Sequence, residues 1–279
     1  METSRAQQRD RVRQWVLLVS AVVAVAVSTI GSGAFGGQPV EQAAGGALSA
    51  TSTLVAPAGP AFSIWGVIYT GLVALAVWQL AAARPDYPRQ RAAGWWLVAS
   101  AVLNALWITV VQLGSLVGSV VVIAALAAVL GVALARLGRT PPRTRVEALL
   151  VDGTTGLYLG WVLIATVANV SAWLKTDVLP TPVPGGESLW AVLVLVVAAA
   201  IGVGIATLTG RLAPTLSLAW GLAWVAVGRT DPSDTTGPVP VVVVVAAAAA
   251  LVVLAAGVRA AVLRHRSTRD VDRARSRVS

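Results

Sequence analysis

PAGPAFSIWGVIY, residues 57–69, is the stretch in which a polar loop gives way to an apolar helix. Two prolines and a glycine keep its first residues extended, because proline fixes φ and the residue before a proline avoids the α region. Phe62, Trp65 and Tyr69 then follow at spacings of three and four, so they share one helical face. Two of these rings carry a polar group, and the face therefore suits either ligand recognition or packing against neighbouring helices.

The composition around this stretch is that of a membrane protein. Of 279 residues, 57% are hydrophobic and only 12% are charged, whereas about 25% is the usual charged share. The chain has no cysteine, and its single histidine, His265, lies in a basic C-terminal segment. Disulfides, cysteine or histidine metal clusters and histidine-dependent catalysis are thereby excluded. Neither a phosphate-binding loop nor a zinc signature is present, so we do not expect a hydrolase.

Eight apolar runs are each long enough to cross a bilayer, which takes about 20 residues in a helix. The predicted helices cover residues 14–35, 61–83, 93–113, 116–137, 146–174, 188–209, 212–228 and 241–263. We take the first as a transmembrane helix because it exceeds the apolar core of a signal peptide, about 7–15 residues.

The proline- and glycine-rich loop around residues 175–187 is the clearest boundary in the chain. We predict an all-α integral membrane protein whose first five helices form one bundle. Residues 1–13 are expected to be a cytoplasmic N-terminal segment and residues 14–175 a five-helix domain. Residues 176–263 would form three additional helices, and residues 264–279 a basic cytoplasmic tail without regular structure.

The charge distribution supports this helix count. Eight crossings place both termini and every second loop on one side, and that side collects nineteen of the 21 basic residues, leaving Lys175 and Arg229 opposite. By the positive-inside rule, both termini are expected in the cytoplasm. The high alanine, valine and arginine usage is typical of a GC-rich bacterial genome, so the expected location is a bacterial inner membrane. The net charge of +9 thus reflects topology, and no nucleic-acid partner is expected.

Two more helices carry polar and aromatic residues on one face. Asn104 and Trp107 are three residues apart in the third predicted helix, and Tyr158, Trp161 and Asn169 share a face of the fifth. An asparagine inside a membrane helix must contact protein, water or ligand. If these faces converge with the one on residues 61–83, they form a mostly apolar pocket that suits a flat hydrophobic ligand. Packing between helices alone is the other interpretation.

Gly156 and Gly160 form a pair of small residues four apart in the fifth predicted helix. Such pairs allow close helix contact, either inside the bundle or in a homodimer. Trp190, Trp220 and Trp224, in the last three helices, carry no ligand signature and are assigned to packing.

Asp152 lies about a turn and a half inside the cytoplasmic end of the fifth predicted helix, where it can pair with a loop arginine or serve a proton-coupled site. A secondary transporter of a small hydrophobic or amphipathic molecule is therefore the alternative function, although no inverted repeat is visible. A purely structural membrane protein is the third interpretation.

Three motifs, PAGPAFSIWGVIY, VLNALW and LYLGWVLIATVAN, resemble in sequence and in order the signatures of the TspO/MBR family. These are tryptophan-rich sensory proteins with five transmembrane helices, related to the mitochondrial translocator protein. The resemblance covers residues 13–175, so the three further helices indicate an extended branch. It implies binding of porphyrins and other flat hydrophobic ligands between the helices, and roles in tetrapyrrole handling, sensing and transport.

Carried over by motif, Trp65, Asn104 and Trp161 match positions that line the family's pocket. The predicted ligand site comprises Phe62, Trp65, Tyr69, Asn104, Trp107, Tyr158, Trp161 and Asn169. No catalytic residue, metal site or required cofactor is predicted, and a porphyrin or heme-type molecule is the expected ligand. In some members of the family, the tryptophans that match Trp65 and Trp161 are linked to light-dependent degradation of the porphyrin. Two departures stand out: LSATSTLVAPAGP before the second helix lacks tryptophan, and Leu157 replaces a common proline.

Overall fold

The computed structural model describes residues 2–31, 38–40, 42–81, 88–179, 185–231 and 237–276, and in these ranges every regular element is a helix. The long helices are α1 (Glu2–Gly31), α2 (Ile64–Ala81), α3 (Pro88–Gln112), α4 (Leu116–Gly138), α6 (Thr154–Trp173), α7 (Glu187–Thr209), α8 (Leu212–Gly228) and α9 (Pro240–Ser276). Short helical pieces are η1 (Ala43–Gly46), η2 (Gly59–Ser63), α5 (Arg145–Glu147), η3 (Ala148–Gly153) and η4 (Leu174–Val178). The predicted all-α fold with eight long helices is confirmed.

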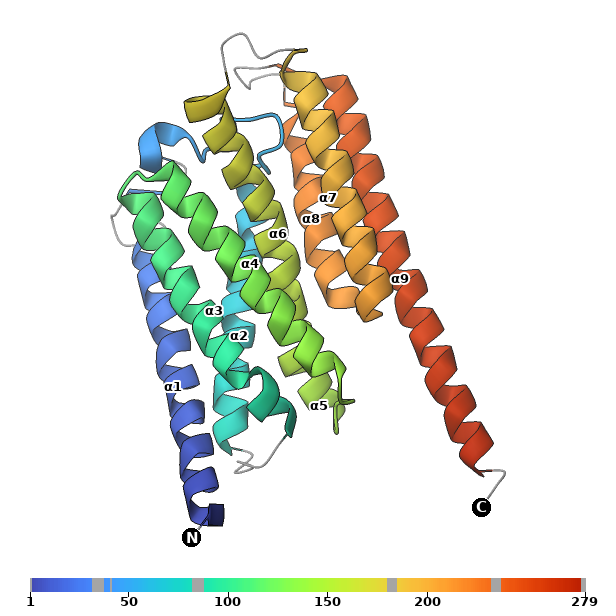
Figure 1. Cartoon of the computed structure of the whole chain (residues 1–279). Coiled ribbons are helices and arrows are strands. Elements are labelled where there is room, and N and C mark those ends of the chain that lie inside the picture. The colour runs from blue at the N-terminus through green and yellow to red at the C-terminus, as the bar shows by residue number, and fades with distance from the viewer. Residues whose placement is uncertain are drawn as a thin grey trace.

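Seven of the described helices are long and apolar enough to cross a membrane, and α8 is a shorter apolar helix. Without water, the backbone of a spanning segment must pair within itself, and a helix does this. Both ends of the chain lie at the same end of the bundle (Figure 1), as an even number of crossings requires. The chain is a multi-pass membrane protein.

The helices next to the two termini are longer than predicted. Helix α1 begins at Glu2, and α9 continues to Ser276, where the tail was expected to lack regular structure. Both extensions are rich in arginine, which favours helix without needing an apolar environment. In the first extension, Arg13 also pairs with Asp10 at 2.9 Å, one turn away.

The fifth predicted helix is continuous but irregular. Its two π-helical turns, η3 and η4, flank α6 near the two ends of the span. A π turn holds one residue more than an α turn and rotates the residues after it. The helix begins with a capping bond, since the Glu147 amide donates to the Thr144 hydroxyl at 3.0 Å.

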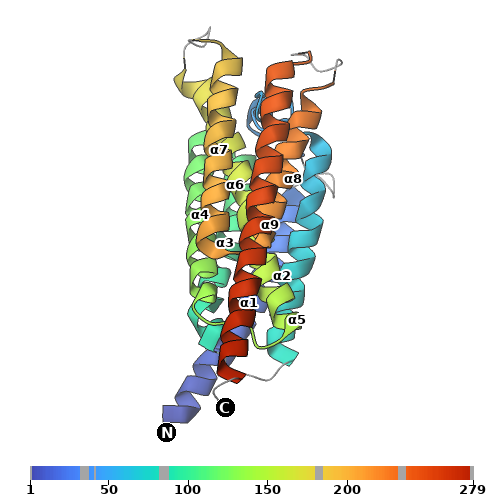
Figure 2. The same cartoon turned by 90° about the vertical axis from the view of Figure 1, so that its right-hand side faces the viewer.

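Helices α1 to α6 form one bundle, and α7, α8 and α9 stand beside it with α8 against α6 (Figures 1 and 2). One hydrophobic cluster runs through both groups and includes Leu159 and Ile164 of α6 with Leu218 and Leu222 of α8. A second cluster lies within the first bundle and includes Leu17 of α1 and Leu97 of α3. The division of the chain at residue 175 remains a prediction about domains.

Gly156 and Gly160 explain how α6 and α8 come so close. A Cβ atom on Gly156 would lie 2.7 Å from the Ala213 Cβ, and one on Gly160 would collide with the Pro214 carbonyl oxygen. The sequence allowed this glycine pair to serve a contact inside the bundle or in a homodimer, and in the structure it contacts α8 of the same chain. The homodimer remains a prediction, and the glycine pair does not support it.

We expect Gly160→Ala to lower the thermal unfolding temperature, because α6 and α8 would have to move apart. Overpacking of this kind costs about 1–3 kcal/mol. The matched control is Gly204→Ala in α7, where an added Cβ would have no neighbouring atom within 4 Å. The unfolding temperature can be followed by tryptophan fluorescence in detergent. An equal effect of both substitutions would show that the close contact between α6 and α8 is unimportant.

Candidate ligand-binding site

Five aromatic rings of the predicted site form one cluster between α2 and α6. Trp65 stacks on Tyr69 with ring centroids 5.0 Å apart. The Trp65 ring meets Tyr158 and Trp161 edge to face, at 5.9 and 6.2 Å. Phe62 meets Trp161 in the same way, at 5.5 Å. Edge and offset contacts are the favoured geometry of aromatic pairs, so the spacing of three and four along η2 and α2 has placed these rings against α6.

Asn104 joins three helices next to this cluster, which it contacts through Tyr69. Its Oδ1 accepts hydrogen bonds from the Ser28 hydroxyl of α1 at 3.0 Å and from the Tyr69 hydroxyl of α2 at 3.2 Å. One turn earlier on α3, the Ser100 carbonyl accepts from the Tyr158 hydroxyl at 3.3 Å. Asn104 is fully buried, and its Nδ2 has no hydrogen-bond partner among the described residues.

Asn169 makes a second junction on the other side of the cluster. Its Oδ1 accepts from the Trp107 indole at 3.3 Å and from the Ser119 hydroxyl at 2.9 Å. Its Nδ2 donates to the Ala165 carbonyl on its own helix at 2.8 Å. The Asn169 side chain thus ties α6 to α3 and α4 and holds the Trp107 ring in place.

A hollow opens between these residues, made of two adjoining cavities. The larger has a volume of about 450 Å³ and lies between α1, α2 and α3. The smaller, about 30 Å³, lies between α3, α6 and the loop before α2. Both are walled by Val40, Phe62, Trp65 and Trp107. Small-molecule sites commonly measure about 300–1,000 Å³, so the hollow has the size of a ligand pocket.

Six of the eight predicted residues line the hollow: Phe62, Trp65, Tyr69, Trp107, Trp161 and Asn169. The other two, Asn104 and Tyr158, lie behind this lining and contact it through Tyr69 and Trp65. Trp161 is 1% exposed, and its indole Nε1 has no hydrogen-bond partner among the described residues. A buried donor without a partner costs about 1–3 kcal/mol, and an acceptor on a bound molecule would recover this.

The loop over the hollow, which we call the covering loop (residues 42–63), is fastened to α8. The Trp220 indole donates to the Ala61 carbonyl at 3.0 Å, and the Ala58 amide donates to the Trp224 carbonyl at 3.2 Å. Trp220 and Trp224 were assigned to packing from the sequence, and their contacts with the loop were missed. In Figure 2 the covering loop lies beside α8.

Arg229 fastens the same loop further along. It is only 1% exposed and donates from Nη2 to the Ala50 carbonyl at 2.6 Å. From the sequence this arginine is simply one of two basic residues on the outer side. Its partner Ala50 is 179 residues away in the sequence. No local sequence pattern could therefore have predicted this contact.

Asp152 belongs to a buried ionic cluster near the opposite end of α6. Arg89 pairs with Glu147 at 2.8 Å and with Asp152 at 2.7 Å, and Arg211 also pairs with Asp152. Arg89 further donates to the Leu137 carbonyl at 3.1 Å. Burial lowers the pKa of the Arg211 guanidinium, and the Asp152 charge opposes that shift. The acid is therefore a partner of arginines that joins α3, η3 and the start of α8.

The helices and the hollow define a multi-pass, all-helical membrane protein with a small-molecule-sized aromatic cavity. A family model described as TSPO-like protein matches residues 14–259. The chain belongs to this TSPO-like family, and the match extends beyond the first five helices into α9. No curated protein and no solved structure matches the chain significantly.

We expect Trp220→Phe to loosen the covering loop, because it removes one of the bonds that hold the loop to α8. Loss of a hydrogen bond of about 1 kcal/mol should speed local amide exchange about fivefold. The measurement is hydrogen exchange of residues 47–61 by mass spectrometry. Trp95→Phe is the matched control, since Trp95 is 53% exposed; if both variants exchange alike, the bond does not hold the loop.

Proposed function

We propose that the protein is a membrane binding and sensory protein for a porphyrin-like or other flat hydrophobic ligand, held between α2, α3 and α6. One observation carries the proposal: the larger cavity of about 450 Å³ shares lining residues with the smaller cavity, and the smaller cavity is lined by Trp161, whose buried indole is unpaired among the described residues. Membership of the TSPO-like family supports the same class of function.

The side chains suit a large flat ring system with a polar edge. The faces of Trp65 and Trp107 can stack against such a ring, and aromatic contacts add to the burial of apolar surface. The Trp161 indole would donate to an acceptor on the ligand, such as a carboxylate or a ring substituent. Asn104 and Asn169 would act by holding Tyr69 and Trp107 in position.

We further propose that both termini are cytoplasmic and that the chain lies in a bacterial inner membrane. The two ends of the chain lie on the same side of the bundle (Figure 1). That side also carries Arg89, Arg136 and Arg211, whereas Lys175 and Arg229 lie towards the other end. This distribution follows the positive-inside rule.

We expect purified protein in detergent to bind protoporphyrin IX saturably, with a Kd that the Trp65→Phe/Trp161→Phe variant raises about tenfold. The reason is the loss of the Trp161 donor, about 1 kcal/mol, together with part of the stacking area. The Kd is read from porphyrin absorbance, because removing tryptophans changes the fluorescence signal itself.

The control is Trp15→Phe/Trp95→Phe, which removes two tryptophans that are more than half exposed. It should leave the Kd unchanged. No saturable binding by the wild type, or an equal loss in both double variants, would overturn the assignment of the pocket.

The alternative, a secondary transporter of a small hydrophobic or amphipathic molecule, makes a different demand. A proton-coupled transporter would need an acid free to exchange protons, whereas Asp152 lies between Arg89 and Arg211. Ligand uptake by proteoliposomes that Asp152→Asn abolishes, in protein that still binds porphyrin, would favour transport over sensing.

A further inference from the structure

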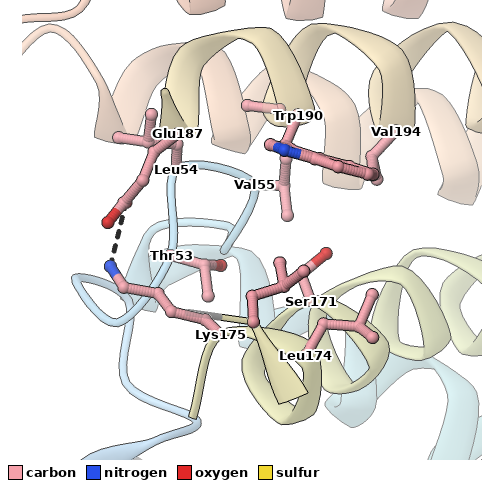
Figure 3. Close-up of a pocket in the computed structure, with 11 residues that line it drawn as sticks. Thr53, Leu54, Val55, Ser171, Leu174, Lys175, Glu187, Trp190 and Val194 are labelled. Carbon is pink, nitrogen blue, oxygen red and sulfur yellow. Dashed lines mark hydrogen bonds and ion pairs between the residues drawn. The ribbon is translucent and has the colours of Figure 1, made fainter. Parts of the chain in front are cut away.

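A separate cavity lies at the C-terminal end of α6, between η4, the covering loop and the start of α7 (Figure 3). Its volume is about 60 Å³, and it shares no lining residue with the hollow described above. The lining combines residues of the first bundle with residues of α7. It therefore exists only because the last three helices stand beside the first bundle.

The rim of this cavity carries one cation and one anion. Lys175 and Glu187 face each other there, with Nζ and Oε2 2.9 Å apart (Figure 3). Both side chains are more than one third exposed. An exposed ion pair of this kind contributes little to stability, so exchanging its partners for those of a ligand costs the fold little.

The interior is apolar with one polar exception. Leu174, Val194 and the Trp190 ring form its walls. Thr53 lies between Lys175 and Ser171 in Figure 3 and is 6% exposed. Its hydroxyl has no hydrogen-bond partner among the described residues. A buried polar group of this kind is normally satisfied, and an oxygen of a bound molecule would satisfy it.

We propose that this cavity binds a phospholipid whose headgroup carries both a primary ammonium and a phosphate. Lys175 would donate to the phosphate, and the ammonium would donate to Glu187, so each charge of the rim meets its opposite. The Thr53 hydroxyl would donate to a phosphate or ester oxygen. One acyl chain would lie against Trp190, and tryptophan is the aromatic residue favoured at headgroup depth.

The charges of the rim favour a headgroup with a primary ammonium and a phosphate over other phospholipid headgroups. An anionic headgroup would pair with Lys175 but would meet the Glu187 carboxylate as a like charge. A quaternary ammonium carries no hydrogen to donate to Glu187. The cavity lies at the depth of the lipid headgroups, because η4 ends one membrane span and Glu187 begins the next. The proposal does not depend on the porphyrin site.

The test is native mass spectrometry of delipidated protein titrated in detergent with phosphatidylethanolamine, phosphatidylcholine or phosphatidylglycerol of the same chain length. The wild type should retain phosphatidylethanolamine preferentially. Lys175→Ala/Glu187→Ala should reduce that retention by about tenfold or more, because it removes both charge-assisted hydrogen bonds proposed for the headgroup. The exchange Lys175→Glu/Glu187→Lys should restore it, because a zwitterion can bind in the reversed orientation.

The matched control is Asp177→Asn, an exposed carboxylate two residues from Lys175 that lies outside the cavity. It should not change lipid retention. Equal retention of the three lipids by the wild type, a preference for phosphatidylglycerol, or unchanged retention in the double alanine variant would each overturn the proposal. The exchanged pair guards against a folding defect, since it keeps both charges at the rim.

Discussion

The fold of this membrane protein depends on the hydrogen bonds that two buried asparagine side chains, Asn104 and Asn169, make to neighbouring helices. A polar side chain within a bilayer has no water to bond with and must find partners on neighbouring helices. Asn104 accepts from α1 and α2, and Asn169 accepts from α3 and α4. Two side chains thereby tie five helices together, and the donors they hold include Tyr69 and Trp107, which line the hollow. The same bonds that join the helices therefore shape the cavity.

The last three helices complete this arrangement. Helix α8 reaches α6 closely because Gly156 and Gly160 carry no side chain, and it holds the covering loop through Trp220 and Arg229. Neighbouring residues of that loop face different spaces: Ser52 lines the hollow, and Thr53 lines the separate cavity beside η4 and α7. One short segment is thus a wall of both cavities, and it is fixed by a helix outside the first bundle. The family match, which extends to residue 259, is in keeping with this dependence.

Much of the fold could be predicted from the sequence, because length and polarity decide what crosses a bilayer. The aromatic faces followed from spacing alone, and the structure brings Phe62, Trp65, Tyr158 and Trp161 together. The ends of α1 and α9 were missed because the apolar run stops where lipid contact stops, whereas the helix continues through arginine-rich polar residues. The hydroxyls of Ser28 and Ser119 could not be singled out, since serine is common in membrane helices and only the fold shows which one meets an asparagine.

A crystal structure grown in a lipid phase with protoporphyrin IX would test most directly whether the hollow receives a flat ligand. We predict a porphyrin beside Trp65 and Trp107, with an acceptor atom within hydrogen-bonding distance of the Trp161 Nε1. A porphyrin bound instead on the lipid-facing surface, with the hollow unchanged, would contradict the account.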